Sequence, residues 1–152
     1  MTISNFVTVY DPGFASSPDE QMNSYYPAWS PDAKWIAFNV GLGHPYDNET
    51  GDLYVVAAEG GTDAVELTNA NITGDIANSW PHWGPLPDDD VYWLTYSSKR
   101  PYGDQITDGR PQIWVASFSS EKAIAGDDPS TPAFWLSNQD PETSNHSTYW
   151  GP

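Results

Sequence analysis

The feature that most constrains the fold of this chain is a tryptophan followed by Ser-Pro or Gly-Pro, which occurs three times. The copies are Trp29-Ser30-Pro31, Trp83-Gly84-Pro85 and Trp150-Gly151-Pro152, and they begin 54 and 67 residues apart. Self-similarity at a spacing of a few tens of residues indicates stacked supersecondary units, and unequal spacing places insertions in the loops. The chain is therefore expected to repeat one structural unit.

The first two copies are followed by the same order of strand-like segments. Short β-branched and aromatic runs are bounded by Gly, Pro, Asn and Asp, the pattern typical of strands in all-β proteins. The predicted strands are 25–30, 35–40, 52–58 and 64–68 in the first unit, and 79–84, 91–97, 112–118 and 132–137 in the second. The alternative is a β-sandwich with incidental Trp-Pro pairs. The same order of parts occurring twice favours the repeat.

The sequence thus predicts an all-β fold of two four-stranded antiparallel units. Two further strands, at 6–10 and 147–151, would each belong to a neighbouring unit. Aromatic residues make up 14% of the chain, which suits strand surfaces and interfaces rather than a disordered segment. Frequent Pro and Gly read as breaks between short elements, so long helices are not expected.

Charge and cysteine content exclude several classes of function. The formal charge is −16, with 5 basic residues, so no basic surface exists to neutralise nucleic-acid phosphates or to bind an anionic membrane. With no cysteine, disulfides, thiolate catalysis and zinc–thiolate sites are excluded. No segment has the ~18 apolar residues of a membrane span, and residues 1–13 lack the pattern of a signal peptide. Neither nucleic-acid binding nor membrane insertion is expected, and the compartment is left open.

The first unit resembles a known repeat. "PAWSPDAKWIAF", "DLYVVAAEGG" and "ELTN" within residues 25–69 are similar to the TolB-type, WD-like β-propeller repeat, with Ala33 where Gly is usual. Residues 79–137 match at the Pro and Trp positions and in the strands, but "LPDDD" replaces the usual turn. Residues 145–152 match only the opening of a third repeat.

The resemblance implies a segment of a larger or oligomeric propeller. Residues 1–24 would be a lead-in with a strand of a preceding blade, 25–69 blade one, 79–137 blade two, and 145–152 the first strand of a third blade. The first-strand tryptophans would be buried between neighbouring blades, in packing rather than catalytic roles. A bacterial protein, periplasmic or extracellular, is implied. The structural repeat positions are Pro27, Trp29, Pro31, Asp32, Pro81, Trp83, Pro85 and Trp150.

No constellation in the sequence indicates catalysis. The three histidines, His44, His82 and His146, have no metal-ligand spacing, and no G-x-S-x-G motif is present. His82 precedes a repeat tryptophan and is open to two interpretations, a side chain facing a central channel or a structural histidine. Adjacent Asp residues lie in turns, where Asp is common for backbone reasons. We therefore expect no enzyme activity and no catalytic residue.

Two acidic loops at equivalent places, 44–52 and 100–109, are candidate calcium sites. Both contain Pro-Tyr followed by closely spaced oxygen-bearing side chains, and calcium takes six to eight oxygen ligands from such loops. The candidate ligands are Asp47, Asn48, Glu49 and Asp52, with Asp104 and Asp108. Neither loop matches the EF-hand pattern, and ordinary turn chemistry is the alternative. Otherwise no cofactor is expected.

Three triplets fit the N-x-[ST] glycosylation pattern, at Asn48, Asn71 and Asn145. Such triplets arise readily in loops rich in Asn and Thr, and we interpret them as chance.

The function that these observations favour is a non-enzymatic binding or scaffolding module that presents loops to a protein or glycan partner. Further blades, in the same polypeptide or by self-association, are the other expected partners. The alternatives are the propeller portion of a larger hydrolase or redox enzyme, and a purely structural subunit of an assembly. Fold does not establish function, so all three rest on the resemblance.

Overall fold

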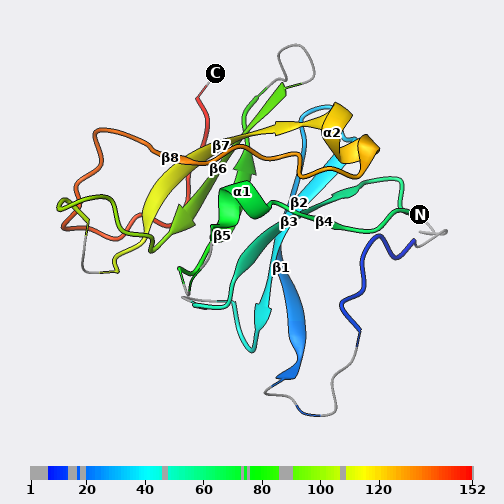
Figure 1. The fold of residues 1–152 in the computed structure, drawn as a ribbon, viewed down its shortest axis with the longest axis horizontal. Helices are drawn as coiled ribbons and strands as arrows, with labels where there is room; N and C mark the ends of the chain where they lie inside the picture. Colours follow the sequence, from blue (N-terminus) through cyan, green and yellow to red (C-terminus); the bar gives the residue numbers. More distant parts are fainter. Residues whose placement is uncertain are drawn as a thin grey trace, which may run out of the picture.

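The computed structural model describes residues 7–13, 17, 20–45, 48–72, 74, 76–85, 91–106 and 109–151. Its strands form two four-stranded antiparallel sheets, each in simple chain order (Figure 1). The first sheet contains β1 (Met22–Trp29), β2 (Trp35–Leu42), β3 (Asp52–Ala57) and β4 (Val65–Glu66). The second contains β5 (Ser79–Trp83), β6 (Val91–Ser98), β7 (Gln112–Ser119) and β8 (Phe134–Trp135). The all-β prediction and the eight strands of the two units are confirmed.

The two sheets also share local detail. The first strand of each has a break in register, between Tyr25 and Ala28 in β1 and between Ser79 and His82 in β5. Inside each break a residue before proline has a positive φ, 51° at Tyr26 and 57° at Trp80. The two rings stack with centroids 4.3 Å apart. The repeated Pro-x-Trp motif therefore produces the same bulge twice and brings two aromatic rings together.

The core lies between the two sheets. Strand alternation divides each sheet into an inner face, which packs on the other sheet, and an outer face. The inner face of the first sheet contributes Trp35, Ala37, Leu53 and Val55, and that of the second contributes Trp83, Tyr92, Leu94, Tyr96, Trp114, Ala116 and Phe118. Four of these rings, those of Trp35, Trp83, Tyr92 and Phe118, form edge-to-face pairs with centroids 5.1–5.6 Å apart.

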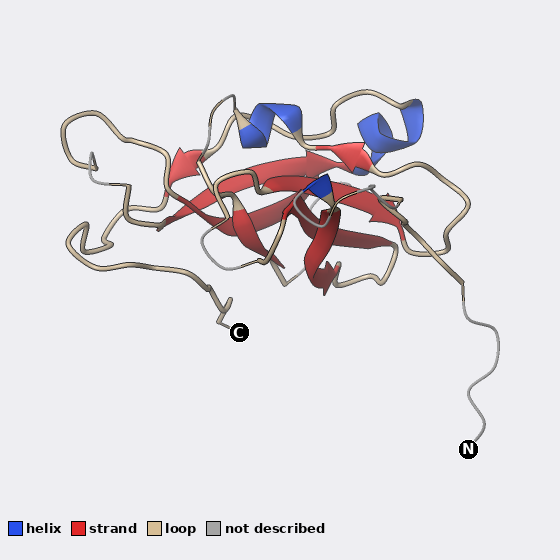
Figure 2. Ribbon diagram, turned by 90° about the horizontal axis from the view of Figure 1, so that it is seen from below, coloured by secondary structure: helices blue, strands red, loops and turns tan. Residues whose placement is uncertain are grey.

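Two short helices were not predicted. α1 (Thr68–Asn71) follows the first sheet, and α2 (Ser120–Ala125) follows β7. Figure 2 shows the strands at the centre of the structure, with short helices and loops around them. α2 has an N-cap, because the Ser119 side chain accepts from Lys122 N, and a left-handed Gly126 ends it. That Ser and Gly pair was a readable signal. No helix within the described ranges is long and apolar enough to cross a membrane.

The two expected flanking strands are absent. Of 6–10, residue 6 lies outside the described residues and 7–10 form no strand, and the described residues of 147–151 form none either. Both segments instead contact the outer faces through side chains. Val9 and Tyr10 pack on the first sheet, and Thr148 contacts Thr95 of the second. The prediction of strands was wrong: in the described structure each segment lies on a sheet face and pairs with no strand.

Candidate functional site

Trp83 joins the two sheets. It is 8% exposed, and its Nε1 donates a hydrogen bond to Ala28 O of β1 at 2.9 Å. Its ring packs on Tyr92 and Phe118 of its own sheet. This is the burial expected for a repeat tryptophan.

Trp29, at the equivalent place in the first sheet, is 59% exposed. The expectation that it is buried is therefore wrong. Trp83 is buried because the first sheet packs against it, whereas among the described residues no second sheet packs against Trp29. The Pro-x-Trp motif determines where the tryptophan lies in its own sheet, and a neighbouring sheet determines whether the ring is buried.

The outer face of the first sheet is apolar. Ile36, Phe38, Val40 and Val56 form a second buried cluster there, covered by Val9, Tyr10 and partly buried neighbours. The Tyr10 ring is tilted against that of Phe38, with centroids 4.9 Å apart, and stacks on that of Tyr54, with centroids 6.4 Å apart. A groove of about 170 Å³ remains between this segment and the sheet, with Trp29, Pro27 and Phe38 in its wall.

The outer face of the second sheet exposes more aromatic surface. Trp93 is 41% and Phe134 51% exposed, and their rings meet edge to face at 6.4 Å. Leu136 and Trp150 are also exposed. The C-terminal segment covers part of this face: Thr148 Oγ1 is hydrogen-bonded to Thr95 Oγ1, and the ring of Tyr149 lies 5.6 Å from that of His82. Exposed aromatic groups therefore occupy both ends of the two-sheet stack.

Helix α1 is held between the sheets by polar groups of the second sheet and its loops. At its start, Asn69 N donates to Asp128 Oδ2 and Ala70 N to Ser130 Oγ. At its end, Ala70 O accepts from Tyr96 Oη and from Arg100 Nη2. Both ends of one helical turn thus have partners for groups that a helix leaves unsatisfied.

Arg100 is the centre of this contact. It is 3% exposed and donates to Ser98 Oγ, to the Ala70 and Asn71 carbonyls and to Asn78 Oδ1. Its guanidinium lies over the rings of Tyr96 and Trp114, 5.3 and 4.9 Å from their centroids. Burial raises the pKa of Tyr96 to about 12, so the tyrosine stays protonated. Burial lowers the pKa of Arg100, but the guanidinium remains a cation because its ordinary pKa is so high.

Asp32 lies in the turn that follows Pro31, as predicted for the repeat. Its Oδ1 accepts from Ser30 Oγ and Lys34 N, and its Oδ2 accepts from Tyr92 Oη of the second sheet at 2.7 Å. Burial acts to raise the pKa of Asp32, but these hydrogen bonds outweigh it and lower the pKa to about 2. The turn aspartate therefore also connects the two sheets.

The remaining repeat prolines lie beside these residues. Pro27 and Pro81 are in β1 and β5, Pro31 begins the turn that contains Asp32, and Pro85 follows Gly84. Gly84 N donates to Trp93 O as Ser30 N donates to Trp35 O, so the two turns start alike.

The predicted calcium ligands are not brought together among the described residues. Asp47 and Asp108 lie outside them. The amide of Asn48 is used within its own loop, donating to Leu42 O and His44 O and accepting from Thr50. Glu49 and Asp104 are exposed. The described part of the chain holds no group of three or more His, Cys, Asp or Glu that could bind a metal, and calcium binding stays a prediction.

Asp52 belongs to a different polar group, with Glu66 and Tyr54. Burial and the Glu66 carboxylate raise the pKa of Asp52 to about 6, although a hydrogen bond with Asn78 acts in the opposite direction. Tyr54 Oη donates to Glu66 Oε2 at 3.3 Å, and burial with the nearby carboxylates raises the pKa of Tyr54 to about 12. The carboxylates of Asp52 in β3 and Glu66 in β4 therefore interact, and no cation is among their partners in the described part of the chain.

The histidines do not form a catalytic pair with an orienting acid in the described structure. His82 Nε2 lies 3.5 Å from Ser147 Oγ, at the limit of a hydrogen bond, and burial lowers the pKa of His82. No carboxylate contact to His82 is present in that part of the chain. His44 is exposed and His146 half-buried. His82 faces the C-terminal segment, which agrees with the interpretation as a structural histidine.

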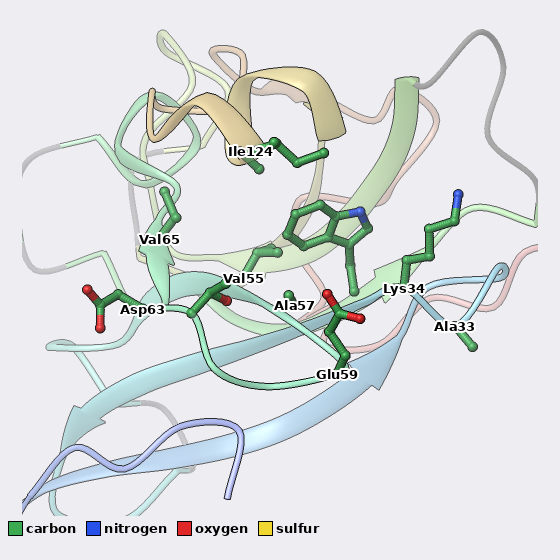
Figure 3. Close-up of a pocket in the computed structure, with 11 residues that line it drawn as sticks. Ala33, Lys34, Val55, Ala57, Glu59, Asp63, Val65 and Ile124 are labelled. Atoms are coloured by element: carbon green, nitrogen blue, oxygen red, sulfur yellow. The ribbon is translucent and has the colours of Figure 1, made fainter. Parts of the chain in front are cut away.

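A cavity of about 560 Å³ lies between α2 and the first sheet (Figure 3). Val55, Ala57 and Val65 form its apolar wall, and Ile124 comes from α2. Glu59 and Asp63 come from the β3–β4 connection, on either side of this wall in Figure 3. Lys34 and Thr62 also line it.

The three N-x-[ST] asparagines have structural roles. Asn71 is 2% exposed, and its amide pairs with both backbone groups of Leu53. Asn145 Nδ2 donates to Gln112 Oε1, and Asn48 is used as described above. Sequence reasoning missed this role. An equivalent amide, Gln139, pairs in the same way with Ile113 of the second sheet.

No protein-family model matches the chain, and neither a curated protein nor a solved structure matches it.

Proposed function

We propose that this chain is a non-enzymatic binding or scaffolding module, built from two propeller-type blades, whose outer sheet faces bind protein. The observation that carries the proposal is the aromatic surface left exposed at both ends of the stack, Trp29 at one end and Trp93 with Phe134 at the other. Exposed apolar surface of this kind marks interaction sites. The TolB-type resemblance supports the same function.

The shape of these surfaces favours protein over a small ligand. Small-molecule sites are concave and enclose most of the ligand, whereas the outer faces are sheet surfaces with aromatic side chains standing on them. Aromatic side chains are enriched at protein interfaces and often dominate their binding energy. A flat aromatic face is therefore expected to bind another folded surface.

The proposal is tested with a fluorescent dye that reports exposed apolar surface. The native chain is expected to bind the dye, and the double variant Trp93→Ser/Phe134→Ser is expected to lose the part of that binding that comes from the outer face of the second sheet, with little change in melting temperature. Both side chains are about half exposed, so they contribute less to folding than core residues do.

Ile124→Ser is the matched control, because Ile124 is 79% exposed on α2 and lies on neither outer face. Dye binding that Ile124→Ser lowers as much as the double variant does would contradict the proposal. So would a native chain that binds no dye.

A further inference from the structure

The registers of the two sheets relate their residues one to one. Trp29 pairs with Ile36 as Trp83 pairs with Leu94, so Trp35 and Trp93 occupy equivalent places. Both then pair onward in the same way, Trp35 with Ala57 and Trp93 with Ser117. In the fourth strands, Val65 and Phe134 are equivalent, because each pairs with the valine at the same place in the third strand.

Because of this equivalence, the contact between the two sheets shows how the two outer faces could pack on each other. The contact joins the inner face of the first sheet, with Trp35, to the inner face of the second, with Trp83. The outer face of the second sheet carries Trp93, the equivalent of Trp35. The outer face of the first sheet carries Trp29, the equivalent of Trp83. The two outer faces are therefore expected to fit each other as the two inner faces do.

The chain also contains three segments with the Trp-(Ser/Gly)-Pro motif, whereas its described residues form two sheets to receive them. β5 lies on the first sheet, with the Trp83 indole bonded to Ala28 O. The C-terminal segment lies on the second sheet, where the Trp150 ring comes within 3.6 Å of the Cβ position of Gly84. β1, with its exposed Trp29, has no such receiving sheet among the described residues.

We infer that the chain associates head to tail with a second copy of itself, the outer face of the first sheet in one copy packing on the outer face of the second sheet in the next. This inference rests on the proposed function and names the partner. Trp29 Nε1 would donate to His82 O of the neighbouring copy, because His82 precedes Trp83 as Ala28 precedes Trp29. Such heterologous contacts close into rings where the rotation allows.

The terminal segments lie where the second copy docks. Val9 and Tyr10 cover the first sheet and Thr148 to Trp150 the second, in both cases without strand pairing. Docking therefore displaces segments held by side-chain contacts alone, and the two ends of the chain compete with association.

The test uses two full-length variants that each disable one face. Trp29→Glu places a carboxylate on the first sheet, and Trp93→Glu places one on the second. Light scattering should show the mass of the wild-type chain rising above 16.8 kDa as its concentration is raised through the micromolar range. Each variant alone should stay at the mass of one chain, and Ile124→Glu should behave as wild type.

Mixing the two variants gives the sharpest result. The Trp29→Glu variant keeps the outer face of the second sheet intact, and the Trp93→Glu variant keeps that of the first sheet. A head-to-tail contact between the two variants therefore yields a complex of two chains and no larger one. A mixture that stays at the mass of one chain overturns the inference, as does either variant that still self-associates. Circular dichroism checks folding, and if Trp93→Glu does not fold, Phe134→Glu disables the same face.

The outcome is separable from that of the proposed function. The wild-type chain could bind the apolar dye on its outer faces and still keep the mass of one chain at every concentration. That result would agree with a binding module and would contradict a second copy as its partner. A chain that neither binds dye nor associates contradicts both.

Discussion

Trp83 and Trp29 occupy the same place in two sheets with the same strand order, yet one is 8% and the other 59% exposed. Both lie in a Pro-x-Trp strand with the same bulge and the same turn hydrogen bond after it. The difference is that a sheet packs against Trp83. A repeat motif therefore fixes where a side chain stands in its unit, and the neighbouring unit decides what that side chain contributes to stability.

The largest expected effect tests that difference directly. Trp83→Ala should lower the free energy of unfolding by about 3–5 kcal/mol, because it leaves a cavity between the sheets and removes the hydrogen bond to Ala28. Trp29→Ala should lower it by less than about 1 kcal/mol, because most of its ring is in water. Urea unfolding at low protein concentration, where association is absent, measures both. Equal losses for the two variants would contradict the comparison.

The second effect concerns the two arginines of the connection between β6 and β7, Arg100 and Arg110. Arg100→Met should lower the free energy of unfolding by about 2–4 kcal/mol, since it leaves the carbonyl of Ala70 and the amide of Asn78 without a buried charged donor. Arg110 pairs with the exposed Glu142, at 3.3 Å. Arg110→Met should change stability by about 0.5 kcal/mol or less. Thermal unfolding of the pair measures this, and a large loss at Arg110 would count against it.

The third effect compares the two amides that pair with a third strand. Asn71→Ala should cost about 2 kcal/mol, because it leaves the buried N–H of Leu53 without its acceptor, although Leu53 O keeps its hydrogen bond from Leu67 N. Gln139→Ala removes the same contacts from Ile113 but at a partly exposed place, and should cost about 1 kcal/mol. Hydrogen exchange at Leu53 and Ile113 should speed up only in the corresponding variant. Faster exchange at both amides in either variant would show that the two places are not independent.

The smallest effect compares two aspartates of the first sheet whose pKa values shift in opposite directions. The pKa of Asp52 is raised to about 6 from 3.8, so the folded chain holds a proton that the unfolded chain releases. Asp52 therefore favours the unfolded state increasingly as pH rises from about 4 to about 6. The full shift corresponds to about 3 kcal/mol, and exposure of the group reduces this to about 1.

The variant Asp52→Asn should therefore be more stable than the wild type at pH 7 and equal to it near pH 3. Asp32, with a pKa lowered to about 2, stabilises the fold above 3.8, and its contribution is lost as pH falls from there through 2. Asp32→Asn should accordingly lower stability at pH 7. Melting temperatures between pH 3 and pH 7 check both signs, and a stability gain at pH 7 from Asp32→Asn would refute the assignment.

Much of the fold was predictable, because the positions of the strands depend on residue types and turn residues that are close together in the sequence. Runs such as 35–40 and 112–118 are β-branched and aromatic and lie between strong turn residues, so they form strands wherever they are placed. α2 had a readable Ser and Gly boundary that the strand-rich context obscured. The segment 147–151 looks like a strand, but it lies on a sheet face, where Thr148 contacts Thr95 through side chains and no strand pairs with it.

The candidate site was less predictable. The sequence indicated the repeat tryptophans, but the exposed pair of Trp93 and Phe134 comes from strands two apart in the second sheet, and only their register brings the rings together. The acidic loops drew attention as calcium ligands. The described structure instead uses Asn48 inside its own turn and Asp52 beside Glu66.

The sequence by itself determined the strands, their order and the doubling of the unit, because these depend on residue type and spacing along the chain. Tertiary structure decided which face of each sheet is buried, and therefore that Trp83 is core and Trp29 surface. It also decided the role of Arg100, whose partners come from a helix about thirty residues earlier in the chain. The physical reason is that the burial and the hydrogen bonds of a side chain depend on the residues that pack against it. Those residues are distant in the sequence, so the local pattern around a side chain does not identify them.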